Sequence, residues 1–226
     1  MKRVKNNRLY LLVVFFYILT QGLSAQNPER YNSCVDGLSI KEYHFDKDKK
    51  TLLFAGSSSI KKWTDIDKYF PEYNVINNGF GGSQFSDLIY FSDKLIGSFN
   101  PDIIFIYEGD NDIAHGKKPY KILKDAKMLL SKIRNDFKNI PVAFISVKPS
   151  IKRWKLNKKY IATNKKLARL CRKEKNVWYI DVWDIMMDKN GKLQKDLFLQ
   201  DDLHMNSKGY NLWRDEINKK LSEIEN

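Results

Sequence analysis

Five short apolar runs recur along the chain, and segments with helical periodicity lie between the later ones. The runs are residues 52–55, 75–76, 103–107, 142–145 and 177–180. Their apolar residues are consecutive rather than alternating with polar ones, which is typical of parallel strands that helices cover on both faces. The pattern therefore predicts a three-layer α/β domain around a parallel sheet.

Three later segments carry the apolar stripe of an amphipathic helix. The first stripe consists of Leu123, Ala126, Leu130, Ile133 and Phe137. The second consists of Leu167, Leu170 and Cys171. The third consists of Tyr210, Trp213, Ile217, Leu221 and Ile224. Asn206 or Ser207 is expected to cap the last helix, because either side chain can accept a hydrogen bond from a free backbone N–H.

The domain is expected to occupy residues 51–226, since we find neither a repeat nor a linker that would divide it. Residues 26–50 are polar and are interpreted as an irregular N-terminal extension. Residues 1–25 have the features of a secretory signal peptide, with a basic start, an apolar run from Leu9 to Leu19 and a small residue at the end. That run would rise about 16 Å as a helix, about half of a bilayer core, so an uncleaved anchor is the weaker alternative. The mature protein is expected to be secreted or periplasmic.

The composition indicates a folded protein and limits the classes of partner that it could bind. Hydrophobic residues make up 42% of the 226 residues, which excludes global disorder. The formal net charge of +13 falls to +9 without the four basic residues of the predicted signal peptide. Such a surface favours anionic partners such as acidic glycans or phospholipid headgroups, although scattered lysines are more often a solvated face. Export argues against nucleic acid as a partner, and the oligomeric state stays open.

Residues that could take part in catalysis or binding follow each predicted strand. In an open parallel sheet, function gathers where the carboxyl ends of the strands meet. The segments at these ends are residues 56–59, 79–83, 108–112, 148–154 and 201–204. They supply serines, glycines with free N–H groups, an asparagine amide and a late Asp-x-x-His pair. Together and in this order, these are the parts of a serine hydrolase.

From Thr51 to Leu221, the sequence resembles the SGNH (GDSL-type) hydrolases. It looks closest to members whose nucleophile block reads Gly-Ser-Ser-Ser-Ile-x-x-Trp, as Gly56 to Trp63 does. The resemblance implies a three-layer α/β/α fold with a flavodoxin-like parallel sheet of five strands, and ester hydrolysis without a metal or organic cofactor. The four name-giving residues of the family match Ser58, Gly82, Asn111 and His204, and its acidic partner matches Asp201.

Ser58 is the expected nucleophile among three adjacent serines. When Gly56 and Trp63 are registered against the commoner Gly-Asp-Ser block, Ser58 falls on the nucleophile and Ser57 on the aspartate. The change at Ser57 removes a charge beside the site. Ser59 is the alternative nucleophile, and a helix-capping role is the alternative for the whole triplet.

The remaining roles follow from the chemistry of acyl transfer. A serine hydroxyl needs a base to take its proton, and His204 is the histidine in a suitable late position. Asp201 would hold the imidazole, with the adjacent Asp202 as an alternative. The oxyanion hole would consist of the backbone N–H groups of Ser58 and Gly82 and the side-chain amide of Asn111.

A metal centre is the competing interpretation of the acidic segment that contains Glu108, Asp110 and Asp112. Metallophosphoesterase-like sites need several histidines and further carboxylates from other strand ends. Residues 56–59 offer no carboxylate, so we disfavour this interpretation. His44 and His115 are expected at the surface or in a structural role.

Three further side chains have open roles. Trp154 follows the fourth strand and is expected either to flank the acyl-acceptor side of the cleft or to cover the core. Cys171 is expected to be a buried free thiol, with a disulfide to Cys34 as the alternative in an exported protein.

The sequence predicts an exported serine esterase that acts on a small-molecule or glycan ester, with short-acyl esters of carbohydrates as the favoured substrates. A lipid or phospholipid acyl hydrolase is the alternative within enzymes. A non-catalytic glycan-binding module on the same fold is the alternative outside them.

Overall fold

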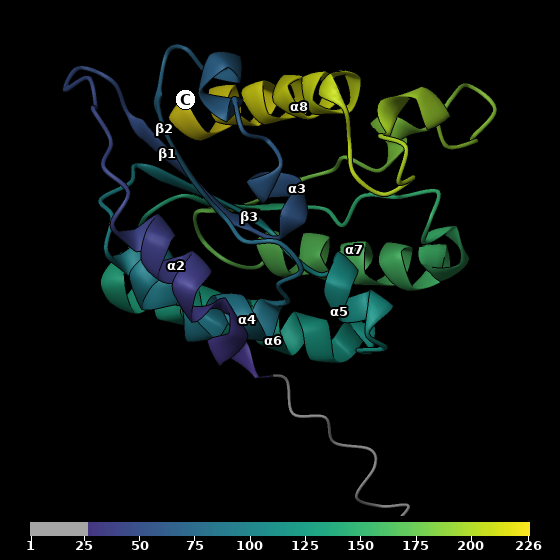
Figure 1. Cartoon of the computed structure of the whole chain (residues 1–226), viewed down its shortest axis with the longest axis horizontal. Helices are drawn as coiled ribbons and strands as arrows, with labels where there is room; N and C mark the ends of the chain where they lie inside the picture. The colour runs from purple at the N-terminus through teal and green to yellow at the C-terminus, as the bar shows by residue number, and fades with distance from the viewer. Residues whose placement is uncertain (1–26) are drawn as a thin grey trace, which may run out of the picture. The chain divides into compact units, whose positions relative to one another are not determined.

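A computed structural model describes residues 27–226 of the protein. Within them, residues Tyr31–Asn226 form one compact unit, and Figure 1 shows the helices of this unit on both faces of a central sheet. The predicted signal peptide, residues 1–25, lies outside the described residues. Each helix in residues 27–226 is too short or too polar to cross a lipid bilayer.

The sheet confirms the predicted strands and their parallel arrangement. Its strands are β1 (Thr51–Gly56), β2 (Asn74–Gly79), β3 (Ile103–Tyr107), β4 (Val142–Ile145) and β5 (Val177–Ile180). All pair in parallel, in the order β2-β1-β3-β4-β5. This is the flavodoxin-like order. The three-layer α/β/α prediction is therefore correct.

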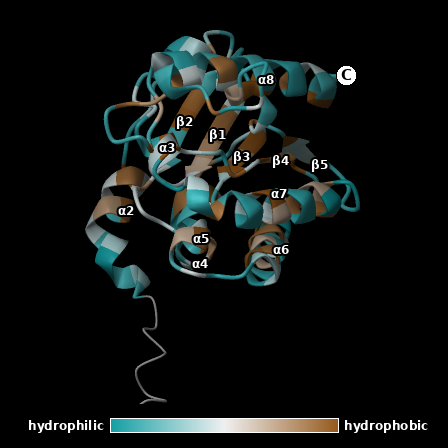
Figure 2. Ribbon diagram, turned by 90° about the vertical axis from the view of Figure 1, so that its right-hand side faces the viewer, coloured by the Kyte–Doolittle hydropathy of each residue, from teal (hydrophilic) through white to brown (hydrophobic). Residues whose placement is uncertain are grey.

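Helices cover both faces of the sheet. The α-helices are α2 (Asn32–Ser39), α3 (Ser58–Lys61), α4 (Phe85–Tyr90), α5 (Asp110–Ala114), α6 (Pro119–Asp136), α7 (Asn157–Cys171) and α8 (Ser207–Glu225). Further helical turns are η1 (Pro28–Tyr31), η2 (Ile66–Tyr69), η3 (Asp93–Gly97), η4 (Trp154–Leu156), η5 (Asp184–Met186) and η6 (Lys195–Leu197). Figure 2 shows α3 and α8 on one face, and α2, α4, α6 and α7 on the other.

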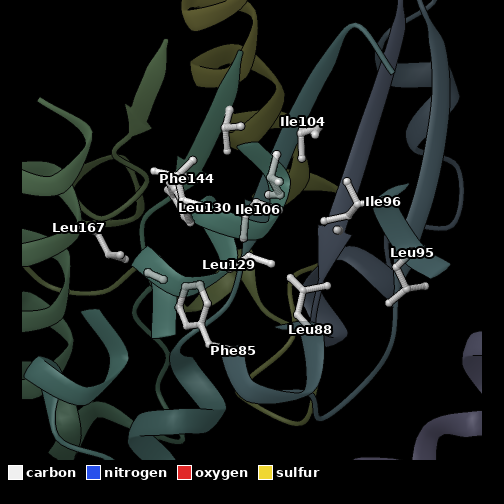
Figure 3. Packing of buried hydrophobic residues seen from close by; sticks show 14 of the residues in the cluster. Phe85, Leu88, Leu95, Ile96, Ile104, Ile106, Leu129, Leu130, Phe144 and Leu167 are labelled. Atoms are coloured by element: carbon white, nitrogen blue, oxygen red, sulfur yellow. The ribbon is translucent and has the colours of Figure 1, made fainter. Parts of the chain in front are cut away.

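Two apolar clusters fill the space between the sheet and these helices. Alternate strand residues point to opposite faces, so Leu53 joins the cluster under α4, α6 and α7, while Leu52 joins the cluster under α8. Figure 3 shows the first cluster, in which Ile106 and Phe144 from the strands meet Leu129 from α6. Full burial of each such side chain stabilises the fold by about 1.5–3 kcal/mol.

The helix stripes agree with the predictions, with one adjustment in α6. Ile122 and Leu129 of α6 are also buried, whereas Leu123 is only partly buried and Phe137 follows the helix end. The apolar face of α6 is thus wider than the predicted stripe. Of the two candidate caps of α8, Asn206 is the one whose side chain accepts hydrogen bonds, from the backbone N–H groups of Lys208 and Gly209.

The N-terminal segment corrects one prediction, because residues 26–50 are not irregular throughout. They contain α2, whose Val35 is fully buried in the cluster under α4. Just before α2, the ring of Tyr31 packs edge-on against Phe80, with centroids 5.2 Å apart. α2 is only eight residues long, so the stripe formed by Cys34, Val35 and Leu38 covers too few positions to stand out in the sequence.

Both cysteines are free thiols in the structure. Cys171 is buried in α7, as its place on the apolar stripe predicts, and burial raises the pKa of its thiol to about 12. Its thiolate is therefore scarce at neutral pH, which makes it a poor nucleophile.

A glycine at the end of β1 generates the first testable prediction. Gly56 has a φ of +150°, and a Cβ there would lie 2.1 Å from the backbone oxygen of Tyr107. We expect Gly56→Ala to lower the free energy of unfolding by about 3 kcal/mol, because both the clash and the backbone strain are costly. Urea unfolding followed by circular dichroism measures this loss.

Gly37→Ala is the matched control. A Cβ at Gly37 meets no atom within 4 Å, and the residue lies within α2. Because alanine favours the helix more than glycine does, Gly37→Ala should raise the free energy of unfolding by up to about 1 kcal/mol. Equal effects of the two substitutions would show that the close approach at Gly56 is unimportant.

Candidate active site

The tight turn after β1 presents Ser58 at the carboxyl edge of the sheet. The backbone N–H of Ser57 donates to the carbonyl oxygen of Tyr107 at 3.1 Å, which keeps the chain against β3 as the strand ends. Ser58 then begins α3. The hydroxyl of Ser57 is fully buried and has no hydrogen-bond partner among the described residues, so it does not cap α3.

The structure brings Ser58, His204 and Asp201 into one hydrogen-bonded series. Nε2 of His204 lies 2.9 Å from Oγ of Ser58, and Nδ1 of His204 lies 2.5 Å from Oδ2 of Asp201. Of the three serines, Ser58 is the one that contacts the imidazole, and Ser59 is buried. Of the two aspartates, Asp201 rather than Asp202 contacts the ring.

Asp201 also holds the backbone of its own loop. Its Oδ1 accepts the backbone N–H groups of Leu203 and His204 at 3.0 and 2.9 Å. Partial burial alone would raise the pKa of Asp201, but the hydrogen bonds from His204 and Leu203 outweigh it and hold that pKa well below its usual range. The carboxylate is therefore ionised at neutral pH and can accept Nδ1–H of the imidazole.

Lys148, just after β4, ties the same loop to the sheet. The residue is almost fully buried, and its Nζ donates to the carbonyl oxygen of Leu203 at 2.5 Å. Burial lowers the pKa of Lys148 to about 8, although the carboxylates of Asp110 and Asp201 oppose this change. A buried ammonium is thus used to fix the backbone that carries His204.

The glycine turn after β2 lies beside Ser58. A Cβ at Gly81 would be 3.8 Å from the Cβ of Ser58. Gly82 has a φ of +84°, which favours glycine. A Cβ at Gly82 would lie 3.3 Å from the hydroxyl of Tyr31, so the N-terminal segment contributes an aromatic side chain next to this turn.

Asn111 connects the segment after β3 to the glycine turn. The side chain is buried, and its Nδ2 donates to the carbonyl oxygen of Ser83 at 2.9 Å. Ser83 in turn donates its hydroxyl to Glu108 at 2.6 Å. Ser58, Gly82 and Asn111 thus come from the ends of three neighbouring strands, as the sequence predicts.

The three carboxyl groups around Asn111 have different partners. Glu108 binds Ser83, while Asp110 binds Arg153 at 3.0 Å and Asp112 binds Lys117 at 2.6 Å. Within residues 27–226, no three His, Cys, Asp or Glu side chains are grouped to hold a metal ion. The carboxyl groups therefore stabilise the segment rather than converge on one point.

Trp154 is 40% exposed, so it does not simply cover the core. Its ring stacks on that of Trp183, with centroids 6.2 Å apart and planes 22° from parallel. Trp183 follows β5 and is partly buried against the core, so Trp154 is the exposed ring of this stacked pair. His115 is exposed, and its Nδ1 lies 2.8 Å from the carbonyl oxygen of Asn111. His44 is exposed as well.

Three contacts of this site were not predicted from the sequence, and they involve Tyr31, Lys148 and Arg153. Tyr31 lies in a segment without periodicity. Lys148 and Arg153 belong to a loop that the sequence places at the correct edge. Their partners, however, are a backbone carbonyl for Lys148 and the Asp110 and Asn111 side chains for Arg153, and a linear sequence does not specify such contacts.

Known proteins resemble this chain in sequence pattern and in fold. The GDSL-like lipase/acylhydrolase family model matches residues 55–212. No curated protein matches the chain.

Solved structures share the fold at low identity. A candidate platelet activating factor from Streptococcus pneumonia has a TM-score of 0.73 and 20% identity, over 96% of this chain and 100% of that one. A GDSL-like lipase from Bacteroides thetaiotaomicron has a TM-score of 0.68 and 16% identity, over 87% and 98%. A family 3 carbohydrate esterase from Clostridium thermocellum has a TM-score of 0.60 and 12% identity, over 79% and 98%.

The buried pair of Asp112 and Lys117 generates a prediction about stability. Asp112 is fully buried, and burial raises its pKa to about 6 even though Lys117 opposes the shift. We expect Lys117→Met to lower the free energy of unfolding by about 3 kcal/mol at pH 8, because a buried carboxylate then lacks its cation. At pH 5, below that pKa, the carboxyl group takes up a proton and the loss should be clearly smaller.

Thermal unfolding of both proteins at the two pH values measures the difference. Lys124→Met removes an exposed lysine of α6, the helix that follows Lys117, and should change the free energy of unfolding little and similarly at both pH values. A loss at pH 5 as large as that at pH 8 would contradict the ionic role of Lys117.

Proposed function

The chain belongs to the GDSL-like lipase/acylhydrolase family, and we propose that it hydrolyses carboxylic esters through an acyl-enzyme intermediate on Ser58. The observation that carries this proposal is the hydrogen-bonded series from Ser58 through His204 to Asp201. In such a series the hydroxyl has a base for its proton, and the base has a carboxylate that fixes its tautomer.

In the first half of the proposed reaction, Oγ of Ser58 forms a bond to the ester carbonyl carbon while Nε2 of His204 takes its proton. Asp201 accepts Nδ1–H, which keeps the lone pair of Nε2 toward Ser58 and stabilises the imidazolium. The proton then passes from Nε2 to the alcohol oxygen as the ester C–O bond breaks. The alcohol leaves, and the acyl group stays on Ser58.

Negative charge develops on the carbonyl oxygen in each tetrahedral intermediate. We propose that the backbone N–H groups of Ser58 and Gly82 and the Nδ2 amide of Asn111 donate to it. One hydrogen of that amide goes to Ser83, which leaves the second for the oxyanion. Each donor of this kind contributes about 3–4 kcal/mol to transition-state stabilisation.

Water completes the cycle by the same route in reverse. His204 takes a proton from water as the water oxygen attacks the acyl carbon, and a second tetrahedral intermediate forms. Its collapse breaks the bond to Ser58, and Nε2 returns the proton to Oγ. The products are one carboxylic acid and one alcohol per ester.

For the substrate, we propose short-acyl esters of carbohydrates. The exposed indole of Trp154, which stacks on the partly buried Trp183, offers a flat apolar surface of the kind that sugar rings stack on. A carbohydrate esterase is among the structures with the same fold. Lipid esters are the second candidate, favoured by the lipase in the family description and by the net positive charge. Under either proposal, the protein would work outside the cytoplasm, after removal of residues 1–25.

Replacement of the proposed nucleophile tests the activity itself. We expect Ser58→Ala to lower the kcat for a short-chain chromogenic ester about 10⁴-fold or more, since the acyl-enzyme can no longer form. Ser59→Ala, one position along, should keep most of the activity. Equal rates for wild type and Ser58→Ala, or hydrolysis by neither, would favour the non-catalytic binding module.

The substrate proposal is tested by Trp154→Ala on two acetate esters. We expect kcat/KM for an acetylated oligosaccharide to fall about tenfold, roughly the loss of one aromatic contact. The value for nitrophenyl acetate should be nearly unchanged, because its alcohol half is not a sugar. Tyr120→Ala removes another exposed aromatic ring and serves as the control. Unchanged kinetics of Trp154→Ala on the sugar ester, with faster hydrolysis of a phospholipid, would favour the lipid alternative.

A further inference from the structure

Arg153 makes contacts that reach the proposed oxyanion hole from outside. Its Nη2 donates to Oδ1 of Asn111 at 3.0 Å, and its Nη1 donates to Oδ2 of Asp110 at 3.0 Å. The guanidinium thus bridges two consecutive residues at the start of α5. The side chain of Asp110 is only 6% exposed and that of Arg153 19%, so both groups are largely shielded from water.

These contacts select one orientation of the Asn111 amide. Oδ1 faces a guanidinium donor, and Nδ2 faces the carbonyl oxygen of Ser83. If the amide were flipped, its N–H groups would face the N–H groups of the guanidinium, and its oxygen would face the carbonyl oxygen of Ser83. Both mismatches are avoided only when Nδ2, with its second hydrogen, is on the side of the glycine turn.

The charge of Arg153 also strengthens the amide as a donor. A cation hydrogen-bonded to an amide oxygen draws electron density from the nitrogen, and hydrogen bonds in such a chain reinforce one another where water is scarce. The bond to Asp110 fixes the plane of the guanidinium, which a lysine could not do, because its ammonium is a point charge on a flexible stem.

We propose that Arg153 is a positioning residue, which orients and polarises the Asn111 side chain so that Nδ2 donates to the developing oxyanion. This inference rests on the esterase function proposed above. Because the oxyanion forms only in the transition state, the loss of Arg153 should lower kcat and leave KM nearly unchanged.

The experiment is a double-mutant cycle with a short-chain chromogenic ester. Arg153→Met should lower kcat about 10- to 100-fold in the wild-type background, with KM within about threefold, as expected for partial loss of one oxyanion donor. In the Asn111→Ala background, the same substitution should change kcat less than about twofold, because its target is already gone. Lys152→Met removes the neighbouring cation, whose side chain is exposed, and should leave kcat unchanged.

The alternative is that Arg153 acts through its loop, because the backbone N–H of Lys152 donates to the carbonyl oxygen of Asp202, close to His204. In that case, Arg153→Met would lower kcat by the same factor in both backgrounds, and this result would overturn the proposal. A rise in KM alone would also overturn it, since it would assign Arg153 to substrate binding.

Arg153→Lys provides a second route if loss of the Asp110 ion pair unfolds the Met variant. It keeps a positive charge near Asp110 but has one nitrogen on a flexible stem in place of the two that bind Asp110 and Asn111, so kcat should still fall at least fivefold in the wild-type background and not in Asn111→Ala. Full activity of Arg153→Lys would overturn the bridging role. Failure of the esterase proposal itself is recognised separately, because wild type and Ser58→Ala would then be equally active or equally inactive.

Discussion

The parallel register of the three strands β2, β1 and β3 is the constraint on which the site depends. Gly56 at the end of β1 pairs with Gly79 of β2 on one side and with Tyr107 of β3 on the other. The chain therefore leaves all three strands at the same level. Segments that are distant in sequence begin their turns side by side, which places Ser58, Gly82 and Asn111 together. A slip of one residue in either pairing would invert the faces and separate these groups.

The loop after β4 supplies two cations that bind the residues of this site. The loop after β4 reaches in two directions, since Lys148 binds the backbone before His204 and Arg153 binds Asn111. One loop thus connects the proposed base with a proposed oxyanion donor. The segment that carries His204 and the segment that carries Asn111 are thus held to one loop by charge-assisted hydrogen bonds. Such bonds are stronger than hydrogen bonds between neutral groups.

The sequence was sufficient for the fold because the strands are buried on both faces and read as continuous apolar runs. It also indicated which strand ends carry chemistry, because Ser58, Gly82, Asn111 and His204 directly follow such runs or lie in late turns. The part that it could not supply depends on contacts between segments. The sequence places Arg153 in a loop at the correct edge of the sheet, but only the fold shows that its guanidinium binds Asn111. Helix α2 was missed because its apolar stripe of Cys34, Val35 and Leu38 is confined to eight residues, too short to stand out in the sequence.

The acidic residues around Asn111 raise an electrostatic problem that the same contacts resolve. Negative charges near the proposed oxyanion hole would oppose the charge that is expected to develop there. Burial raises the pKa of Glu108 well above its usual range, with Asp112 adding to the shift, so burial works against a negative charge on this group. Asp110 and Asp112 are each paired with a cation, Arg153 and Lys117. The carboxyl groups can thus hold the turns in place by hydrogen bonding while contributing little net negative charge at the oxyanion. The segment from Glu108 to Asp112 has three acidic residues and is nevertheless compatible with stabilisation of an anion. Arg153, which we propose to orient the Asn111 amide, is also one of the cations that balance this acidic charge.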